Sequence, residues 1–261
     1  MSSETVLYEI EGLVEWLQIK VNEAKARGLV VGVSGGIDSA VVAALICKAF
    51  PNQSLGLILP CHSSQEDVAD AHLVCDSIGI FKQVINLDEP HQIILDSVVT
   101  GLGEVVPIGE GQQTRRLTDA NLRARLRMSA LYAVANSLNY LVVGTDNAAE
   151  VYTGYYTKYG DGGVDLLPLS LFAKREVRVL AKALKIPEKI IIKAPSAGLW
   201  LGQTDEGEMG VTYNEIDNYL EGKPVSETAR QRIAYLHQIS EHKRNLPLVY
   251  PRKRSIITRQ T

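Results

Sequence analysis

Apolar residues recur at helical spacing at the start of the chain, and short, wholly apolar runs follow. The spacing from Val6 to Val21 predicts an amphipathic helix. Residues 29–33, LVVGV, are too short an apolar run for a helix and are closed by two glycines, which predicts a fully buried strand. Residues 39–49, apolar and rich in Ala, then predict a helix that packs on a sheet. The chain therefore begins with a helix and a unit of strand, glycine-rich loop and helix.

The alternation of strands and helices continues. Residues 55–59 and 84–87 predict two further strands. Between them, Ser63 and Glu66 have the spacing of a capping box at the start of a helix.

A long helix and a fourth strand complete the pattern. Asp119 is placed to cap a helix that runs to Leu138, and residues 141–143 form a short apolar run that ends at Gly144. Strands that alternate with helices predict a parallel sheet with helices on both faces, which is a doubly wound α/β fold. No linker, repeat or low-complexity tract divides the chain, so we expect one domain over residues 1–261.

Two stretches fit neither the helical nor the strand period. Residues 101–117 are rich in Gly and Gln, and residues 194–210 are rich in Gly and acidic side chains. Long loops in compact domains are usually lids or binding loops, so both stretches are candidates for ordering on a ligand. Residues 213–220 and 226–238 predict helices with a polar, Tyr-bearing surface.

The composition excludes several classes of protein. A chain of 261 residues with 46% hydrophobic content can form one large core. A net charge of −3 provides no overall positive surface for nucleic acid or a membrane, and no apolar run approaches the ~20 residues of a membrane span. Cys47, Cys61 and Cys75 lack metal-site spacing and are interpreted as small buried hydrophobic residues. We expect a cytoplasmic protein without a signal peptide.

The strongest chemical signal is SGGIDS at residues 34–39, between a buried strand and a helix. Two glycines allow φ > 0, and the free N–H groups at the helix start form an anion site of phosphate size. The segment lacks the ending of a Walker loop and the third glycine of a dinucleotide fingerprint. Asp38 would repel a phosphate unless a cation lay between them, so magnesium is implied. The alternative is an ordinary glycine turn in which Asp38 and Ser39 cap the helix.

This segment resembles the PP-loop of the N-type ATP pyrophosphatases, which adenylate a substrate and release pyrophosphate. The resemblance implies an adenine nucleotide alpha hydrolase-like fold, with ATP as co-substrate and its pyrophosphate end held by the loop. The loop residues concerned are Gly32, Val33, Ser34, Gly35, Gly36, Ile37, Asp38 and Ser39.

A second signal, GTDNAAE at residues 144–150, also follows the end of a buried strand. Ligands of open parallel sheets bind at the carboxyl ends of strands, so Asp38 and Glu150 are predicted to face one crevice. Two carboxylates near a triphosphate suit a magnesium ion. Taken alone, Glu150 is explained equally well as a surface charge or a helix cap.

The segment at residues 153–165, TGYYTKYGDGGVD, is too polar and too rich in glycine for a core element, so it is a candidate binding segment. The alternative is a solvated loop without a function. The longer run over residues 144–169 resembles the NAD synthetases closely and specifically. Further matches are spread over roughly residues 30–243, including APSAGLW at 194–200 and EHKR at 241–244. The resemblance implies a homodimer in which the deamido-NAD site lies near the subunit interface. The apolar face of the first helix would suit such an interface or the cover of its own core.

The resemblance also implies roles for individual residues. Asp38 and Glu150 would bind Mg²⁺, and Asp161 is the residue placed to receive ammonia and its proton. ATP would be contacted, outside the PP-loop, by Thr145, Lys174 and Ser196. Deamido-NAD would be contacted by Arg125, Lys158, Asp165, His242 and Lys243. The predicted catalytic set is Asp38, Asp161 and Lys174.

Three of these side chains also have a physical rationale. On the long helix, Arg125 can present its guanidinium to a phosphate or ribose, whereas its neighbours Arg123 and Arg127 are interpreted as solvated. Lys174 opens a helix, where a cation is mildly unfavourable unless a phosphate is near; otherwise it is a surface lysine. His242 has no visible carboxylate partner, so we assign it to binding.

The predicted reaction joins these parts. The nicotinate carboxylate of deamido-NAD attacks the α-phosphorus of ATP, and ammonia then displaces AMP to give NAD. About thirty residues precede the PP-loop, which leaves no room for an attached glutaminase domain. The alternatives are another PP-loop ATP pyrophosphatase ligase, such as a GMP synthetase core or a tRNA-modifying enzyme, and a non-catalytic nucleotide-binding module of the same fold.

Overall fold

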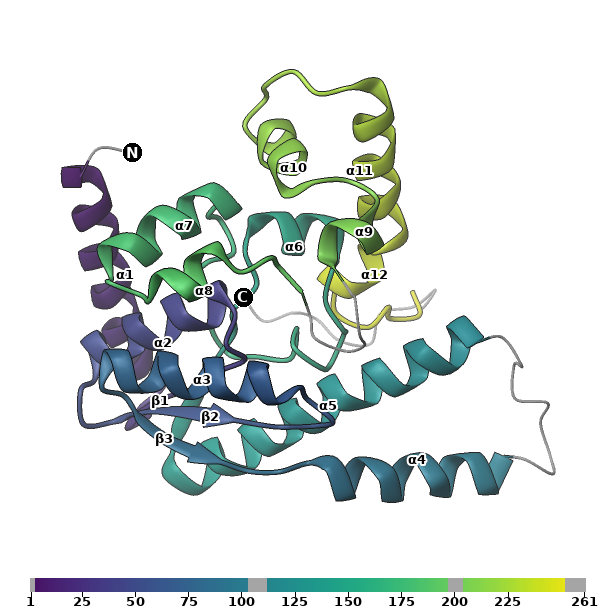
Figure 1. Ribbon diagram of the computed structural model, residues 1–261, viewed down its shortest axis with the longest axis horizontal. Helices are drawn as coiled ribbons and strands as arrows, with labels where there is room; N and C mark the ends of the chain where they lie inside the picture. The colour runs from purple at the N-terminus through teal and green to yellow at the C-terminus, as the bar shows by residue number, and fades with distance from the viewer. Residues whose placement is uncertain (1–2, 103–111, 197–203, 252–261) are drawn as a thin grey trace.

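The protein is built around a four-stranded parallel sheet (Figure 1). The computed structural model describes residues 3–102, 112–196 and 204–251. The strands are β1 (Gly28–Gly32), β2 (Ser54–Ile58), β3 (Phe81–Val84) and β4 (Tyr140–Val143), in the order β3-β2-β1-β4. All three neighbouring pairs are parallel, as the sequence predicted.

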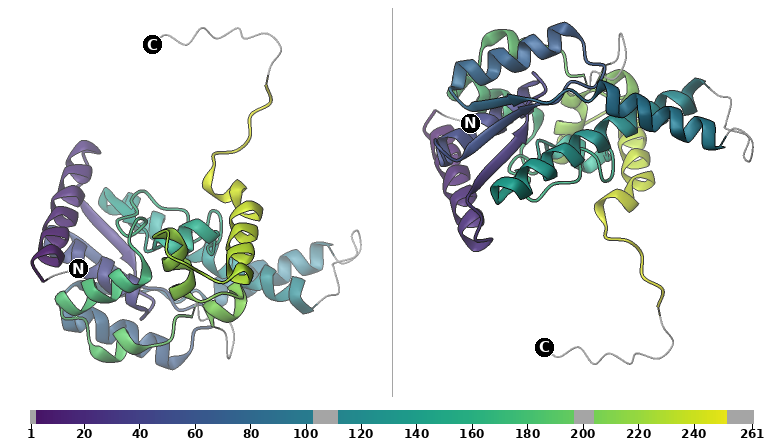
Figure 2. Two further views of the ribbon diagram at one scale, coloured as in Figure 1. Left: turned by 90° about the horizontal axis from the view of Figure 1, so that it is seen from above. Right: turned by 90° about the horizontal axis from the view of Figure 1, so that it is seen from below.

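The two faces of the sheet carry separate apolar clusters. In β1, Leu29 and Val31 pack into one cluster and Val30 into the other, because successive strand residues point to opposite faces. The first face is covered by α2 (Ile37–Ala49) and α3 (Gln65–Ile78), with α1 (Ser3–Glu23), α7 (Lys174–Ala183) and α8 (Glu188–Ile192) packed beside them. The second face is covered by α5 (Gln112–Leu138) (Figure 2). The doubly wound architecture is confirmed, and α1 covers the protein's own core.

The order of the strands places a crevice between β1 and β4. The chain moves from β1 outward through β2 to β3 and then returns to the other side of β1 as β4. At such a reversal the loops after the two central strands separate, and this is where doubly wound sheets bind ligands. The loops at 33–36 and 144–147 both begin there.

A third apolar cluster lies beyond the sheet. It joins α6 (Ala148–Thr153), α9 (Asp205–Met209), α10 (Tyr213–Leu220) and α11 (Glu227–Ile239), and α12 (Glu241–Arg244) follows. The helices α9 to α12 form the green to yellow group at the right of Figure 1, and α6, in teal, packs against α10 and α11. The two predicted helices after residue 210 are therefore confirmed. From this group of helices, Asp205 and Glu208 of α9 and Lys243 of α12 line the crevice.

Two predicted boundaries were wrong. The cap of α3 is Ser64, whose Oγ accepts a hydrogen bond from the Asp67 backbone N–H, while the Ser63 Oγ accepts one from Arg127. The third strand is β3, three residues before the predicted run, because this exposed edge strand carries the polar sequence FKQV, which gives no strong apolar signal.

The long helix also begins earlier than predicted. α5 starts at Gln112, so Asp119 lies inside it and pairs with Arg123 one turn later and with the buried His91 of α4 (Asp88–Leu102). Of the two stretches predicted to be irregular, 101–102 and 112–117 are helical and 205–209 forms α9. Their central parts, residues 103–111 and 197–203, lie outside the described residues.

Two further sequence expectations can be compared with the structure. Among the described residues, no helix is long and apolar enough to cross a membrane. Cys61 and Cys75 are buried and Cys47 is half-buried, and each is a free thiol. Burial raises the pKa of the Cys75 thiol to about 11, which suits its interpretation as a hydrophobic residue.

Candidate active site

A large cavity opens at the carboxyl ends of β1 and β4. Its volume is about 510 Å³, and it is lined by the loop after β1, the loop after β4, the glycine-rich segment 154–163 and residues 193–196. Segments that are far apart in the sequence thus meet around one space. Of the predicted ATP-binding residues, all except Gly35 line this cavity.

The loop after β1 is shaped for an anion. Gly35 has φ +83°, and a Cβ at this position would lie 2.8 Å from the Asp70 Cβ of α3, so only glycine fits without strain. The Ser34 Oγ accepts a hydrogen bond from the Gly36 backbone N–H at 3.2 Å, and the Ser39 Oγ donates to the Gly36 carbonyl at 2.9 Å. Gly36 is the N-cap of α2 and has no side chain to cap the first N–H groups. The start of α2 is therefore open to a phosphate.

At the floor of the cavity, a lysine lies between two carboxylates. The Lys174 Nζ is 2.5 Å from an Asp38 oxygen and 3.5 Å from a Glu150 oxygen, and the Lys174 side chain is only 2% exposed. Burial alone would lower the pKa of Lys174, but the charges of Asp38 and Glu150 outweigh it and raise the pKa. Burial raises the pKa of Glu150 to about 7 against the opposing effect of Lys174. These three residues are a coupled buried charge cluster.

Two neutral side chains hold the carboxylates in place. The Asn147 side chain donates to the Asp38 carboxylate at 3.1 Å and also accepts hydrogen bonds that cap α6. Tyr213 is only 1% exposed, and its hydroxyl lies 2.8 Å from Glu150 and 3.0 Å from Asp205. The Lys174 ammonium lies 4.5 Å from the centre of the Tyr213 ring. The loops after β1 and β4 are thereby joined to α10.

The position of Lys174 is set by a residue of α10. Ala173 precedes α7 and has no side-chain oxygen to act as a cap. Instead the buried Asp217 carboxylate accepts hydrogen bonds from the backbone N–H groups of Lys174 and Arg175, at 3.1 and 3.0 Å. A carboxylate at a helix N-terminus also suits the helix dipole. The prediction that Lys174 opens a helix is confirmed, and its cation faces the cavity floor.

The glycine-rich segment forms the opposite wall. The Asp161 carboxylate accepts a hydrogen bond from the Thr157 backbone N–H at 2.8 Å and lines the cavity. The Lys243 Nζ donates to the carbonyls of Gly154 and Tyr156 at 2.7 and 2.6 Å. Burial lowers the pKa of Lys243, although Asp161 opposes this effect. This wall therefore combines one carboxylate with a lysine committed to backbone oxygens.

The predicted deamido-NAD residues are not all brought to the cavity. Of the five, only Lys243 lines it. Arg125 is exposed on α5, and its guanidinium donates a hydrogen bond to the Lys158 carbonyl. The Lys158 ammonium donates to the backbone carbonyls of His242, which is exposed, and of Asn245. The Asp165 carboxylate accepts hydrogen bonds from the Tyr132 hydroxyl and the Val142 backbone N–H, which fasten this segment to β4.

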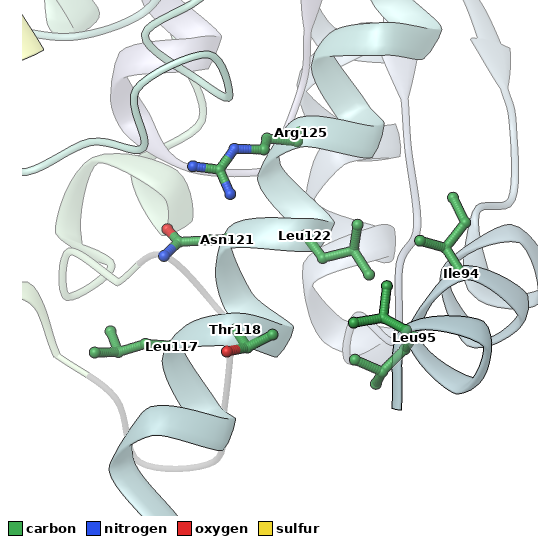
Figure 3. Close-up of a pocket in the computed structure, with 8 residues that line it drawn as sticks. Ile94, Leu95, Leu117, Thr118, Asn121, Leu122 and Arg125 are labelled. Atoms are coloured by element: carbon green, nitrogen blue, oxygen red, sulfur yellow. The ribbon is translucent and has the colours of Figure 1, made fainter. Parts of the chain in front are cut away.

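A smaller pocket of about 370 Å³ lies beside Arg125, between α4 and α5. Figure 3 shows Leu122 of α5 facing Ile94 and Leu95 of α4, while Arg125 points from the other side of α5. The α4 surface continues as an exposed apolar face made of Ile93, Ile94, Val98, Val99 and Leu102.

The prediction that Arg123 and Arg127 are solvated was wrong. Arg127 donates to the Leu59 carbonyl at 3.0 Å and to Ser63, and it lines the cavity. Arg123 pairs with Asp119 at 2.7 Å. Sequence reasoning also missed Tyr213 and Asp217, because their partners lie far away in the chain. The sequence predicted a polar, Tyr-bearing surface for this helix, but Tyr213 and Asp217 are each only 1% exposed, because both face the charge cluster and the start of α7.

Comparisons with known proteins show the family of the chain. The model of the NAD synthase family matches residues 9–247. The chain belongs to this family. It is 54% identical to the NH(3)-dependent NAD(+) synthetase of Alkaliphilus oremlandii, over 94% of this chain and 97% of that protein, and 52% identical to its counterpart in Alkaliphilus metalliredigens, over 93% and 97%.

Solved structures share the fold of this chain. The NMN synthetase from Francisella tularensis superposes with a TM-score of 0.87 at 42% identity, covering 96% of this chain and 99% of that one. The NH3-dependent NAD synthetase from Campylobacter jejuni superposes with a TM-score of 0.74 at 27% identity, covering 96% and 100%. The chain thus covers 97% or more of each of these four proteins, and the predicted fold class and family are confirmed.

Proposed function

We propose that this protein is an ammonia-dependent NAD synthetase that acts in the cytoplasm. It activates the nicotinate carboxylate of deamido-NAD with ATP and amidates it with ammonia, giving NAD, AMP and pyrophosphate. The observation that carries the proposal is the cluster of Asp38, Lys174 and Glu150 at the floor of a cavity whose rim is a phosphate-binding loop. Membership of the family and the names of the relatives support the same reaction.

ATP binds with its β- and γ-phosphates on the loop at 32–39 and on the open start of α2. Thr145 and Ser196 line the same cavity and contact the nucleotide. Lys174 offsets the negative charge that develops on the pyrophosphate as it leaves. The protein thereby contributes positioning and charge neutralisation, which are the main sources of catalysis in phosphoryl chemistry.

The donor set of Asp38 and Glu150 fits a magnesium ion. Both carboxylates lie within reach of one point, now held by the Lys174 ammonium, and both line the cavity. Mg²⁺ commonly takes one or two protein carboxylates and completes its shell with phosphate oxygens and water. Mg²⁺ would neutralise phosphate charge at this position, and Asn147 and Tyr213 would hold its two ligands.

Deamido-NAD occupies the side of the cavity formed by the glycine-rich segment. Its contacts are assigned to Arg125, Lys158, Asp165, His242 and Lys243. Arg125, Lys158 and His242 are linked to one another outside the cavity. We propose that a homodimer completes this part of the site, because the exposed apolar face of α4 lies next to Arg125 on a hairpin that extends from the body of the protein (Figure 1).

The reaction proceeds in two displacements. An oxygen of the nicotinate carboxylate attacks the α-phosphorus of ATP, pyrophosphate leaves, and an acyl-adenylate forms. Ammonia then attacks the acyl carbon, AMP leaves with the oxygen, and Asp161 accepts the proton that the nitrogen loses. Asp38 and Lys174 act in the first displacement, and Asp161 acts in the second.

The experiment is an incubation of the purified protein with ATP, Mg²⁺, deamido-NAD and ammonium, in which NAD and AMP are measured together. We expect equal amounts of both products. Formation of AMP without NAD would support the adenylation step but refute deamido-NAD as the acceptor. Binding of ATP without any product would favour a non-catalytic nucleotide-binding module.

A second acceptor belongs in the same assay. The high structural similarity to an NMN synthetase favours nicotinate mononucleotide as a candidate, since it presents the same carboxylate without the adenylyl half. A higher kcat/KM for deamido-NAD than for the mononucleotide supports the assignment as an NAD synthetase. A higher kcat/KM for the mononucleotide would instead assign the protein as an NMN synthetase.

A further inference from the structure

One of the four cationic side chains that line the cavity has no part in the proposed reaction. Lys174 and Lys193 each form ion pairs with two carboxylates. Lys243, which donates to two backbone carbonyls, is already assigned to deamido-NAD. The fourth is Arg127, on α5, which forms no ion pair within the described parts of the chain. No carboxylate therefore neutralises its charge by direct contact.

Arg127 is held in place by neutral acceptors. Its Nε donates to the Leu59 carbonyl at 3.0 Å, and its Nη2 donates to the Ser63 Oγ at 3.1 Å. Both acceptors belong to the segment that follows β2, so the plane of the guanidinium is fixed, while its Nη1 donates to no described residue. Burial lowers the pKa of Arg127, but a guanidinium remains charged at neutral pH. A charged, oriented guanidinium that faces a cavity is suited to bind an anion.

The position of Arg127 on α5 lies between two walls of the cavity. One turn earlier, Ala124 packs against the glycine-rich segment, since a Cβ on Gly160 would lie 2.9 Å from the Ala124 Cβ. One turn later, Leu131 packs against the end of β1, since a Cβ on Gly32 would lie 3.5 Å from the Leu131 Cδ1. α5 therefore connects the wall assigned to deamido-NAD with the loop assigned to the phosphates of ATP, and Arg127 lies between these two contacts.

The proposed reaction brings two anions together in this region. The β- and γ-phosphates lie on the loop at 32–39, and deamido-NAD lies on the glycine-rich segment, so the α-phosphate and the nicotinate carboxylate meet between them. Both groups are negatively charged and repel each other as the attack begins. Lys174 serves the pyrophosphate end, whereas Arg127 lies between the two binding regions. A preorganised cation in such a position stabilises the charge that develops in the transition state.

We propose that Arg127 is a catalytic residue that binds the α-phosphate of ATP. This inference rests on the proposed function and adds a residue to its first displacement. A carboxylate oxygen of deamido-NAD forms a bond to the α-phosphorus, the bond from the α-phosphorus to the bridging oxygen breaks, and its electron pair leaves with pyrophosphate. Arg127 donates to a non-bridging oxygen of the α-phosphate throughout and transfers no proton. It then holds the phosphate of the acyl-adenylate and, after amidation, that of AMP.

The test separates the α-phosphate from the rest of the nucleotide. AMP and adenosine differ only in that phosphate, and calorimetry measures the affinity of each for the wild type, Arg127→Met and Arg127→Lys. ATP–pyrophosphate exchange with deamido-NAD measures the rate of the adenylation step in the same proteins. Arg123→Met is the matched control, because Arg123 lies one turn earlier on α5, pairs with Asp119 and does not line the cavity.

We expect the Kd of AMP to rise roughly ten- to a hundredfold in Arg127→Met, the range for loss of one charged hydrogen bond, while the Kd of adenosine stays within about threefold of wild type. Exchange should slow roughly a hundred- to a thousandfold, as for loss of one donor to a developing charge. Arg127→Lys keeps the charge and should recover part of both effects. Arg123→Met should retain the wild-type preference for AMP over adenosine, even if its thermal midpoint falls.

Equal losses of affinity for AMP and adenosine would overturn the inference, because they would show that Arg127 acts only through the Leu59 carbonyl and the nucleoside. An AMP affinity or an exchange rate in Arg127→Met within about threefold of wild type, or a wild type that binds both ligands equally, would also overturn it. If Arg127→Met does not fold, Arg127→Lys decides, since lysine lacks the planar fork and should weaken AMP selectively. Absence of both exchange and NAD formation in the wild type would instead overturn the proposed function.

Discussion

Replacement of Lys174 by Met tests the charge cluster at the cavity floor. The change keeps the length of the side chain but removes the cation between Asp38 and Glu150, whose side chains are 17% and 13% exposed. Breaking a buried pair by removing one partner costs about 3 to 5 kcal/mol, because the remaining charge is left uncompensated. With a urea dependence of about 3 kcal/mol per M, the unfolding midpoint at pH 8 should fall by about 1 to 2 M.

The loss should be smaller at pH 6. A carboxyl whose pKa is raised in the folded state stabilises the protein at low pH, and this contribution is lost as the pH rises through the folded pKa. Glu150 has a folded pKa of about 7, and removal of Lys174 raises it further, because Lys174 is the largest cause that lowers it. Between pH 8 and pH 6 the variant therefore gains about one more kcal/mol than the wild type.

The measurement is urea unfolding followed by circular dichroism at both pH values. Lys82→Met is the control, since Lys82 pairs with the exposed Asp76 and such surface pairs contribute about 0 to 1 kcal/mol. A loss below about 1 kcal/mol at pH 8, or a loss that grows toward pH 6, would refute the interpretation of this cluster as a coupled buried charge site.

Three other changes address separate parts of the site. Gly35→Ala should destabilise the protein by about 2 kcal/mol or more and abolish ATP binding in calorimetry. Gly36→Ala should have the smaller effect on stability, because the nearest atom to the added Cβ would be the Ser34 Oγ, at 3.3 Å. Tyr213→Phe should lower the free energy of unfolding by about 1 to 2 kcal/mol and slow ATP–pyrophosphate exchange about tenfold, because the Glu150 carboxylate loses a hydrogen-bond donor. An unchanged exchange rate would show that Lys174 and the Asn147 backbone hold the Glu150 carboxylate sufficiently. Val98→Glu, on the exposed face of α4, should convert the proposed dimer to a monomer in light scattering, and a wild-type monomer would exclude this interface.

The fold was predictable because its signals are local. The apolar run of β1 and the two glycines after it are adjacent in the sequence, so the strand, the loop and α2 could be located closely. The strand β3 was misplaced because it lies at the edge of the sheet and buries little. The start of α5 was misplaced because Asp119, a good capping residue, is used instead for the pair with His91, a contact with another helix that no local pattern reveals.

The site was predictable where one loop forms it and less so where distant elements meet. Asp38 and Glu150 could be assigned to one crevice because both follow central strands. Two determinants of the floor could not be foreseen: the position of Lys174 between the two carboxylates, and the hydroxyl of Tyr213. Each depends on the separation of side chains from different elements, which the order of residues does not specify.

The hydrogen bonds from α7 to Asp217 have a consequence for the order in which the enzyme matures. Lys174 occupies its place because a carboxylate 43 residues later in the chain receives the first N–H groups of its helix. During synthesis on the ribosome, a chain that has reached only α7 already contains Asp38, Glu150 and Lys174, but it lacks the residue that fixes their lysine. The buried charge cluster is therefore expected to take its final geometry only after α10 has emerged.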